Sequence, residues 1–178
     1  MNKIGLVIVS CCLALLLGCS SLPDRTNLVS ARVTRVISGQ TVEVLLTDTS
    51  EVMKVRIIGI DAPDLRQDPW GEVAKNRLIE LVMAMPVELE LETESDRPVN
   101  ELRDRFNRLP AHIWQNQTLI GQQLVESGCV LANDSYEHKY SKLMQESQEY
   151  ARALGYGIWN PQQAMRYTPS QFRSMNKQ

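Results

Sequence analysis

Three short segments of the chain carry charged or amide side chains where apolar runs end. They are Ser-Gly-Gln-Thr at residues 38–41, Arg-Ile-Ile-Gly-Ile-Asp-Ala-Pro-Asp at residues 56–64, and Asp-Arg-Phe-Asn-Arg at residues 104–108. Carboxylate and amide oxygens can coordinate a hard cation, and a carboxylate can take a proton from water. Arginine pairs well with the oxygens of an anion. These residue types could therefore bind a cation, activate a water molecule and hold an anion, provided that the fold brings the segments together.

Arg56 is the most unusual of these residues because it interrupts a run of valine and isoleucine. Arginine is rarely buried without a partner. From the residues alone, an ion pair with Asp61 or Asp64 that closes the fold is favoured over a site for a bound anion. Both interpretations stay open at this point.

The elements that would position these segments can be read from periodicity. Strands are expected at residues 29–37, 41–46, 52–60, 87–92 and 111–114, where the runs are aliphatic or alternate between apolar and acidic. Apolar residues at helical spacing predict three helices, at residues 70–85, 119–127 and 136–154. Pro86, Gly128 and Gly155 are placed to end them. The predicted fold is α+β, a five-stranded OB-type β-barrel with three α-helices.

With these elements in place, residues 31–161 resemble the staphylococcal nuclease (thermonuclease) family. The three segments stand where that family has D-G-D-T, R-L-x-x-x-D-x-P-E and D-K-Y-G-R, and Ile158-Trp159 matches an I-W near the end of the family domain. The order and spacing of all three motifs, with the same elements between them, make the resemblance specific. The fold that it implies is the OB barrel with three helices predicted above.

The resemblance implies Ca²⁺-dependent hydrolysis of phosphodiester bonds in DNA or RNA. Arg56 and Arg108 match the two arginines that stabilise charge on the phosphate. Asp61, the backbone carbonyl of Ala62 and Gln40 match the metal-binding positions. Asp64 matches the position of the base, where the family usually has the longer glutamate.

Gln40 departs most from the family pattern. A glutamine carbonyl can coordinate Ca²⁺ but brings no charge, so the metal site is expected to be weakened. Ser38 replaces the other aspartate of the first motif, and Glu43 has the wrong strand parity to substitute. Two functions therefore remain: a nuclease with weakened activity, or an inactive nuclease-fold module that binds a phosphate, a nucleic acid or a protein partner.

The first residues are expected to direct the chain out of the cytoplasm. Lys3 precedes an apolar run that is too short for an evident membrane span, and Leu-Leu-Gly-Cys at residues 16–19 resembles the lipobox of bacterial lipoproteins. The predicted organisation is a signal peptide at 1–18, a lipidated tether at 19–28, the nuclease-like domain at 29–161 and a polar, poorly ordered tail at 162–178. The resemblance implies a lipid on Cys19, an extracytoplasmic membrane location and, as a further option, a protein partner in a membrane complex.

The remaining candidates are interpreted as structural. The net charge is −2, so phosphate binding would need a local site rather than an overall basic surface. Cys129 is expected to be buried packing, Trp70 and Trp114 core residues, and His112 a packing or surface residue. His138 is expected to be exposed, with neither histidine at metal-ligand spacing. The acidic residues from Glu88 to Asp96 are expected to form a solvated face.

Overall fold

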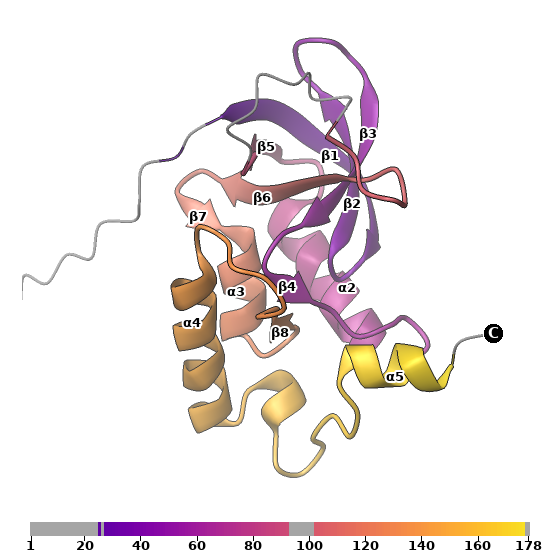
Figure 1. Cartoon of the computed structure of the whole chain (residues 1–178), viewed down its shortest axis with the longest axis vertical. Helices are drawn as coiled ribbons and strands as arrows, with labels where there is room; N and C mark the ends of the chain where they lie inside the picture. The colour runs from indigo at the N-terminus through magenta and orange to yellow at the C-terminus, as the bar shows by residue number, and fades with distance from the viewer. Residues whose placement is uncertain (1–24, 26, 93–101, 177–178) are drawn as a thin grey trace, which may run out of the picture.

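The computed structural model describes residues 25, 27–92 and 102–176, and its centre is a closed β-barrel (Figure 1). The barrel strands are β1 (Leu28–Ser38), β2 (Thr41–Leu46), β3 (Val52–Ile57), β5 (Pro86–Glu90) and β6 (Leu109–Gln115). Antiparallel pairing runs in the order β3-β2-β1-β5-β6, and a parallel pairing of β3 with β6 closes the cylinder. Closure leaves the barrel without a free edge, so the predicted α+β, OB-type fold is confirmed.

The inward side chains of the strands fill the barrel with aliphatic groups. Val42 and Val44 on β2, Val55 on β3, Leu89 on β5 and Ile113 on β6 are all fully buried. This alternation fixes the strand register, because a slip by one residue would turn each of these side chains to the other face.

Helix α2 (Trp70–Val82) packs on β1, and helix α3 (Ile120–Glu126) packs on β6. Helix α4 (Ser141–Leu154) packs against α3, and the 3-10 helix η2 follows at Gly157–Trp159. Gly128 and Gly155 follow α3 and α4 with φ of +66° and +67°, as expected for glycines that end helices. Helix α4 begins later than predicted, because the segment before it folds into a turn in which Ser141 N–H donates to the His138 carbonyl at 2.9 Å.

The third predicted strand is interrupted at Gly59, where φ is +78°. A side chain at this glycine would collide with the His138 ring, since an ideal Cβ would lie 2.4 Å from its Cε1. The chain then forms a separate short strand, β4 (Ile60–Asp61), paired with β8 (Leu131–Ala132). The break carries Asp61 out of the barrel wall and to its mouth.

The prediction of a poorly ordered tail was wrong for residues 169–175. They form helix α5 (Pro169–Met175), drawn in yellow beside the loop that leads into α2 (Figure 1). Thr168 and Gln171 make a capping box, and proline occupies the first helical position. Gln67 Nε2 also donates to the Tyr167 carbonyl at 2.6 Å, which ties the segment to the loop before α2.

The core predictions for Trp114 and Cys129 are confirmed, with exposed fractions of 1% and 6%, whereas Trp70 is only half-buried. Burial raises the pKa of the Cys129 thiol, which suits an inert packing residue. Cys19 and the predicted signal peptide lie outside the described residues. Within the part of the chain that the structure describes, no helix has the length and apolarity needed to span a membrane.

Candidate functional site

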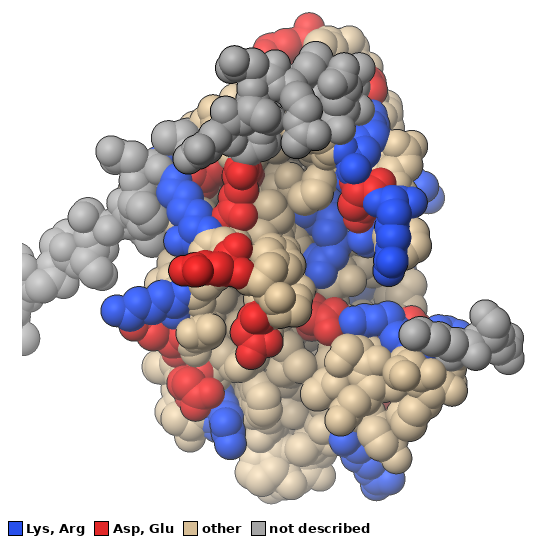
Figure 2. All heavy atoms as spheres, in the orientation of Figure 1, with Lys and Arg blue, Asp and Glu red and all other residues tan. Residues whose placement is uncertain are grey.

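The three sequence segments meet at one cleft of about 1210 Å³ at the mouth of the barrel. Figure 2 shows this face, where Lys and Arg side chains gather with carboxylates among them. The described lining includes six cationic side chains and three carboxylates: Lys54, Arg56, Arg66, Arg105, Arg108 and Arg173, with Asp61, Asp64 and Asp134. The cleft is therefore locally positive on a chain whose net charge is −2.

Arg56 projects from β3 and is held by backbone carbonyls. Its guanidinium donates to the carbonyl of Ile60 at 2.7 Å and to that of Ile57. Burial lowers the pKa of Arg56 to about 10, with Arg108 and Arg173 contributing and Tyr136 and Asp61 opposing. The side chain stays charged at neutral pH. Its hydrogen bonds go to carbonyls rather than to Asp61 or Asp64, so the structure does not show the ion pair that the residues alone favoured.

Arg108 reaches the same cleft from the turn before β6. Its Nε and Nη2 donate to Asp104 Oδ2 at 2.9 and 2.7 Å, and its Nη1 lies 3.4 Å from the Thr41 hydroxyl. Thr41 pairs with Arg56 across β2 and β3. The closed barrel thus brings together two arginines that are 52 positions apart, and Asp104 fixes the plane of one of them.

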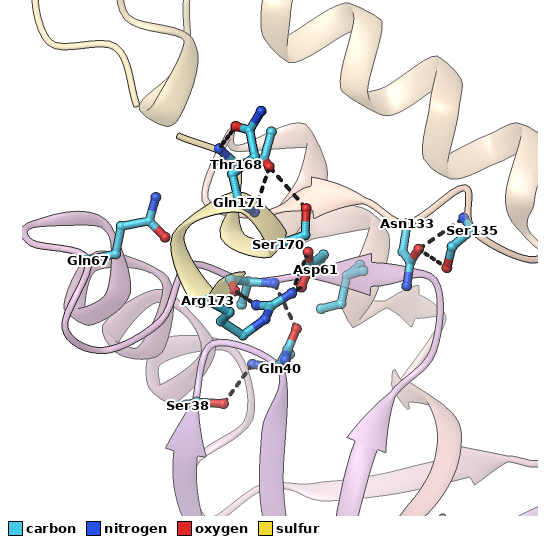
Figure 3. A network of polar contacts seen from close by, with 12 residues as sticks. Ser38, Gln40, Asp61, Gln67, Asn133, Ser135, Thr168, Ser170, Gln171 and Arg173 are labelled. Carbon is cyan, nitrogen blue, oxygen red and sulfur yellow. Dashed lines mark hydrogen bonds and ion pairs between the residues drawn. The ribbon is translucent and has the colours of Figure 1, made fainter. Parts of the chain in front are cut away.

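The three predicted metal-binding groups also lie together, but each already has a protein partner (Figure 3). Gln40 Oε1 accepts a hydrogen bond from Ala62 N–H at 2.7 Å. Both Asp61 carboxylate oxygens accept from Arg173 Nη2, at 2.8 and 2.9 Å. Arg173 Nη1 lies 3.4 Å from the Ala62 carbonyl oxygen.

This arrangement does not fit a Ca²⁺ ion. Ca²⁺ takes six to eight oxygen ligands, usually with several negative charges. Of the three predicted donors only Asp61 is charged, and its charge is paired with Arg173. A guanidinium occupies the position in front of Asp61 and Ala62 where the resemblance implies a metal ion.

Asp64 lies in the cleft lining as predicted, but it faces Arg66. Asp64 Oδ1 accepts from the Arg66 Nε and backbone N–H at 2.9 and 3.0 Å, and Oδ2 accepts from Nη2 at 3.2 Å. The hydrogen bonds from the Arg66 side chain lower the pKa of Asp64, so the carboxylate is ionised at neutral pH. An ionised carboxylate can accept a proton, but its lowered pKa makes it a weaker base.

Arg173 and its helix are the part of the site that the sequence interpretation missed. A signal was present, because Thr-Pro-Ser-Gln at residues 168–171 has the capping-box spacing with proline at the first helical position. Nothing in that local pattern indicates where α5 docks, since Arg173 meets an aspartate 112 positions away.

Outside the cleft, the structure brings together Glu92, His112 and His138, whose ligand atoms lie within 4.8 Å of one another. The prediction that His138 is exposed was wrong, since 7% of it is accessible. His112 Nε2 lies 2.8 Å from Glu92 Oε1, and His138 Nδ1 accepts from Tyr140 N–H at 3.3 Å. The acceptor role of Nδ1 requires neutral His138 with its proton on Nε2. His112 Nε2 and His138 Nδ1 are thus used within the protein, which indicates a structural network. The buried His112 Nδ1 and His138 Nε2 have no hydrogen-bond partner among the described residues.

The prediction that Glu90 belongs to a solvated acidic face was also wrong. Only 1% of this residue is exposed. Its carboxylate accepts from Trp114 Nε1 at 2.7 Å, the Tyr140 hydroxyl at 2.8 Å and Lys139 Nζ at 2.5 Å. Glu90 thus links β5, β6 and the start of α4.

We expect stability to fall as the pH is lowered below about 6.5, the ordinary pKa of histidine. Burial, followed by the nearby His112, lowers the pKa of His138, so the folded state binds this proton less readily than the unfolded chain. Burial acts to raise the pKa of Glu92, but hydrogen bonds from His112 and Lys139 outweigh it, and the net effect is a lowered pKa. The contribution of Glu92 to stability is therefore lost at lower pH, below the ordinary glutamate pKa of 4.5. Both losses have the same sign. Urea unfolding from pH 7.5 to 4 should show a falling free energy of unfolding, at up to about 1.4 kcal/mol per pH unit for one proton.

His138→Gln should flatten the upper part of this profile and leave the lower part in place. An unchanged slope between pH 6.5 and 5 in this variant would contradict the assignment to His138.

Comparison with known proteins agrees with the fold and the cleft. The family model described as Staphylococcal nuclease homologue matches residues 54–161. An "Uncharacterized endonuclease" of Haemophilus influenzae is 29% identical over 148 residues, which are 83% of this chain and 75% of that protein. The "Thermonuclease" of Staphylococcus intermedius is 26% identical over 137 residues, 71% of this chain and 74% of that protein.

The matched range contains Arg56, Asp61, Asp64 and Arg108, whereas Gln40 and Arg173 lie outside it. On this match, and on the closed barrel with both arginines at its mouth, the chain belongs to the staphylococcal nuclease homologue family.

Proposed function

We propose that the chain is a nuclease that hydrolyses phosphodiester bonds of DNA or RNA in the cleft, with weakened activity. The observation that carries this proposal is the convergence of Arg56 and Arg108 at one locally positive cleft, in a chain that belongs to a nuclease family. Two guanidinium groups can donate to the non-bridging oxygens of a phosphodiester and stabilise the charge that develops there.

Asp64 is the candidate base. In the proposed step, a water molecule attacks phosphorus and Asp64 takes one proton from that water. The bond from phosphorus to the leaving oxygen breaks, and the leaving oxygen takes a proton from solvent to become a hydroxyl. Asp64 Oδ2 accepts one hydrogen bond from the Arg66 guanidinium, at 3.2 Å, and keeps a second lone pair for the attacking water. This pairing and the short aspartate side chain both support a slow reaction.

The resemblance implies Ca²⁺ as the cofactor. We propose that dependence on Ca²⁺ is weakened here, because Gln40 is neutral and bonded to Ala62 N–H, and because Asp61 is paired with Arg173.

The same observations favour a second candidate, a nuclease-fold module that binds a phosphate, a nucleic acid or a protein partner without cleaving it. Such a module needs the arginines but neither the metal nor a free base.

A cleavage assay distinguishes the two candidates. The full chain in detergent is incubated with heat-denatured DNA in Ca²⁺ or in EDTA, and acid-soluble nucleotides are measured. We expect slow release at similar rates in both conditions. Binding of the DNA with no release in either condition would support the module instead, and release only in Ca²⁺ would show an intact metal site.

We further propose that the protein is an extracytoplasmic lipoprotein, anchored to a membrane through Cys19. The proposal is supported by the apolar run and Leu-Leu-Gly-Cys at residues 16–19. Mass spectrometry of the mature N-terminus tests it: an unmodified Cys19 would exclude the anchor.

A further inference from the structure

Arg173 is held at the cleft by several specific contacts. Its guanidinium bonds to both oxygens of Asp61 and approaches the Ala62 carbonyl, at 2.8, 2.9 and 3.4 Å. The Asp61 side chain is 18% exposed and that of Arg173 is 39% exposed, so the pair is partly shielded but still open to the cleft. Arginine keeps its charge and presents planar donors, which suits a lasting pair with a carboxylate.

Helix α5 holds Arg173 in this place. The capping box at Thr168 and Gln171 fixes the start of the helix, and buried Pro169 packs at its first turn. The hydrogen bond from Gln67 to the Tyr167 carbonyl joins the residue before the capping box to the loop that follows Asp64. Figure 3 shows Arg173 between Asp61 and Gln40, with Gln67 on the adjoining loop.

Arg173 also adds to the positive charge that lines the cleft. Arg108 and Arg173 both act to lower the pKa of Arg56, so each lies within electrostatic range of the Arg56 guanidinium. All three line the same cleft. The guanidinium of Arg173 has five N–H donors, and the pairing with Asp61 uses only some of them. The others can donate to a bound anion.

We propose that Arg173 is the resident cation of this cleft, in place of a divalent metal ion, and that the cleft binds a phosphate group of a nucleic-acid backbone without metal. The inference rests on the proposed function for its ligand, a nucleic acid. The inference goes beyond the proposed function because it assigns the cation of the site to the protein's own C-terminal helix. The neutral Gln40 follows from this assignment: its amide oxygen holds Ala62 N–H, and a further carboxylate is not needed for a metal.

The first test measures binding to a fluorescein-labelled oligothymidine by fluorescence anisotropy, with the full chain in detergent. We expect binding in EDTA, changed less than about twofold by Ca²⁺. Arg173→Gln should weaken binding in EDTA by roughly tenfold, the loss expected for one hydrogen bond to a charged group. Arg173→Lys should restore part of it. Arg166→Gln is the matched control, because Arg166 is an exposed arginine of the same C-terminal segment that lies outside the cleft lining.

The second test uses Ca²⁺ alone as the probe, followed by isothermal titration calorimetry. We expect no saturable binding to the wild-type chain below about 1 mM, the weak end of the range for protein calcium sites. The double variant Gln40→Asp/Arg173→Gln should gain such binding, because it frees Asp61 and adds a second carboxylate. Wild-type binding of Ca²⁺ in this range would overturn the proposal.

The outcomes separate this inference from the proposed function. One outcome is that the wild-type chain cleaves DNA while Arg173→Gln binds the oligonucleotide as tightly as the wild type or more tightly. This would support the nuclease and overturn the role of Arg173 in binding, because Arg173 would then block the site. Metal-free binding that depends on Arg173, without cleavage, would support the inference and reject hydrolysis. Oligonucleotide binding only in Ca²⁺ would overturn the inference.

Discussion

Arg56→Ala and Arg108→Ala are each expected to lower the rate of DNA cleavage by about 10²- to 10³-fold, the loss typical of removing one donor to a developing negative charge. The two guanidiniums reach the cleft from β3 and from the turn before β6, and Thr41 lies between them through its pairing with Arg56 and its contact with Arg108. A loss in kcat with little change in KM would show that the arginines act mainly on the transition state.

Arg152→Ala is the control for these two variants. Arg152 is an exposed arginine on α4 that pairs with Glu149 and lies over the Trp159 ring, and it does not line the cleft. Its removal should leave the cleavage rate unchanged. Cleavage that persists at the wild-type rate in both Arg56→Ala and Arg108→Ala would show that the activity belongs elsewhere, or to a contaminant.

Glu90→Ala is expected to lower the free energy of unfolding by about 3–5 kcal/mol, the range for breaking a buried charge network from one side. The substitution removes the common acceptor of Trp114 and Tyr140, both 1% exposed, and of Lys139. Burial together with the Glu90 carboxylate raises the pKa of the Tyr140 hydroxyl, so that group remains a donor with nothing to bond. Urea unfolding followed by tryptophan fluorescence gives the value.

Glu88→Ala is the matched control, two positions earlier on the same strand. Glu88 pairs with Arg25 near the surface, and 40% of its side chain is exposed. Such pairs contribute only about 0–1 kcal/mol. A loss for Glu90→Ala no larger than that for Glu88→Ala would mean that the buried network adds nothing to stability.

The barrel and the two arginines could be predicted from sequence because their signals are local. Alternation in β2 and β5, the helical spacing in α2 and α4, and the glycines after α3 and α4 each depend on residues a few positions apart. The resemblance of the three motifs to the nuclease family then implied that Arg56, Asp61, Asp64, Arg108 and Gln40 lie together at the mouth of the barrel. The structure brings all five into the cleft lining.

The side-chain partners of these residues were set by packing between distant segments. Alternation put Glu90 on the outer face of β5, but the turn before α4 covers that face and supplies the donors that bury it. The same turn buries His138 against Gly59. Arg173 pairs with an aspartate 112 positions away because α5 docks beside the loop before α2. Periodicity tells which way a side chain faces along its own element, whereas the element that covers that face, and the charge it brings, depends on how the whole chain is arranged in space.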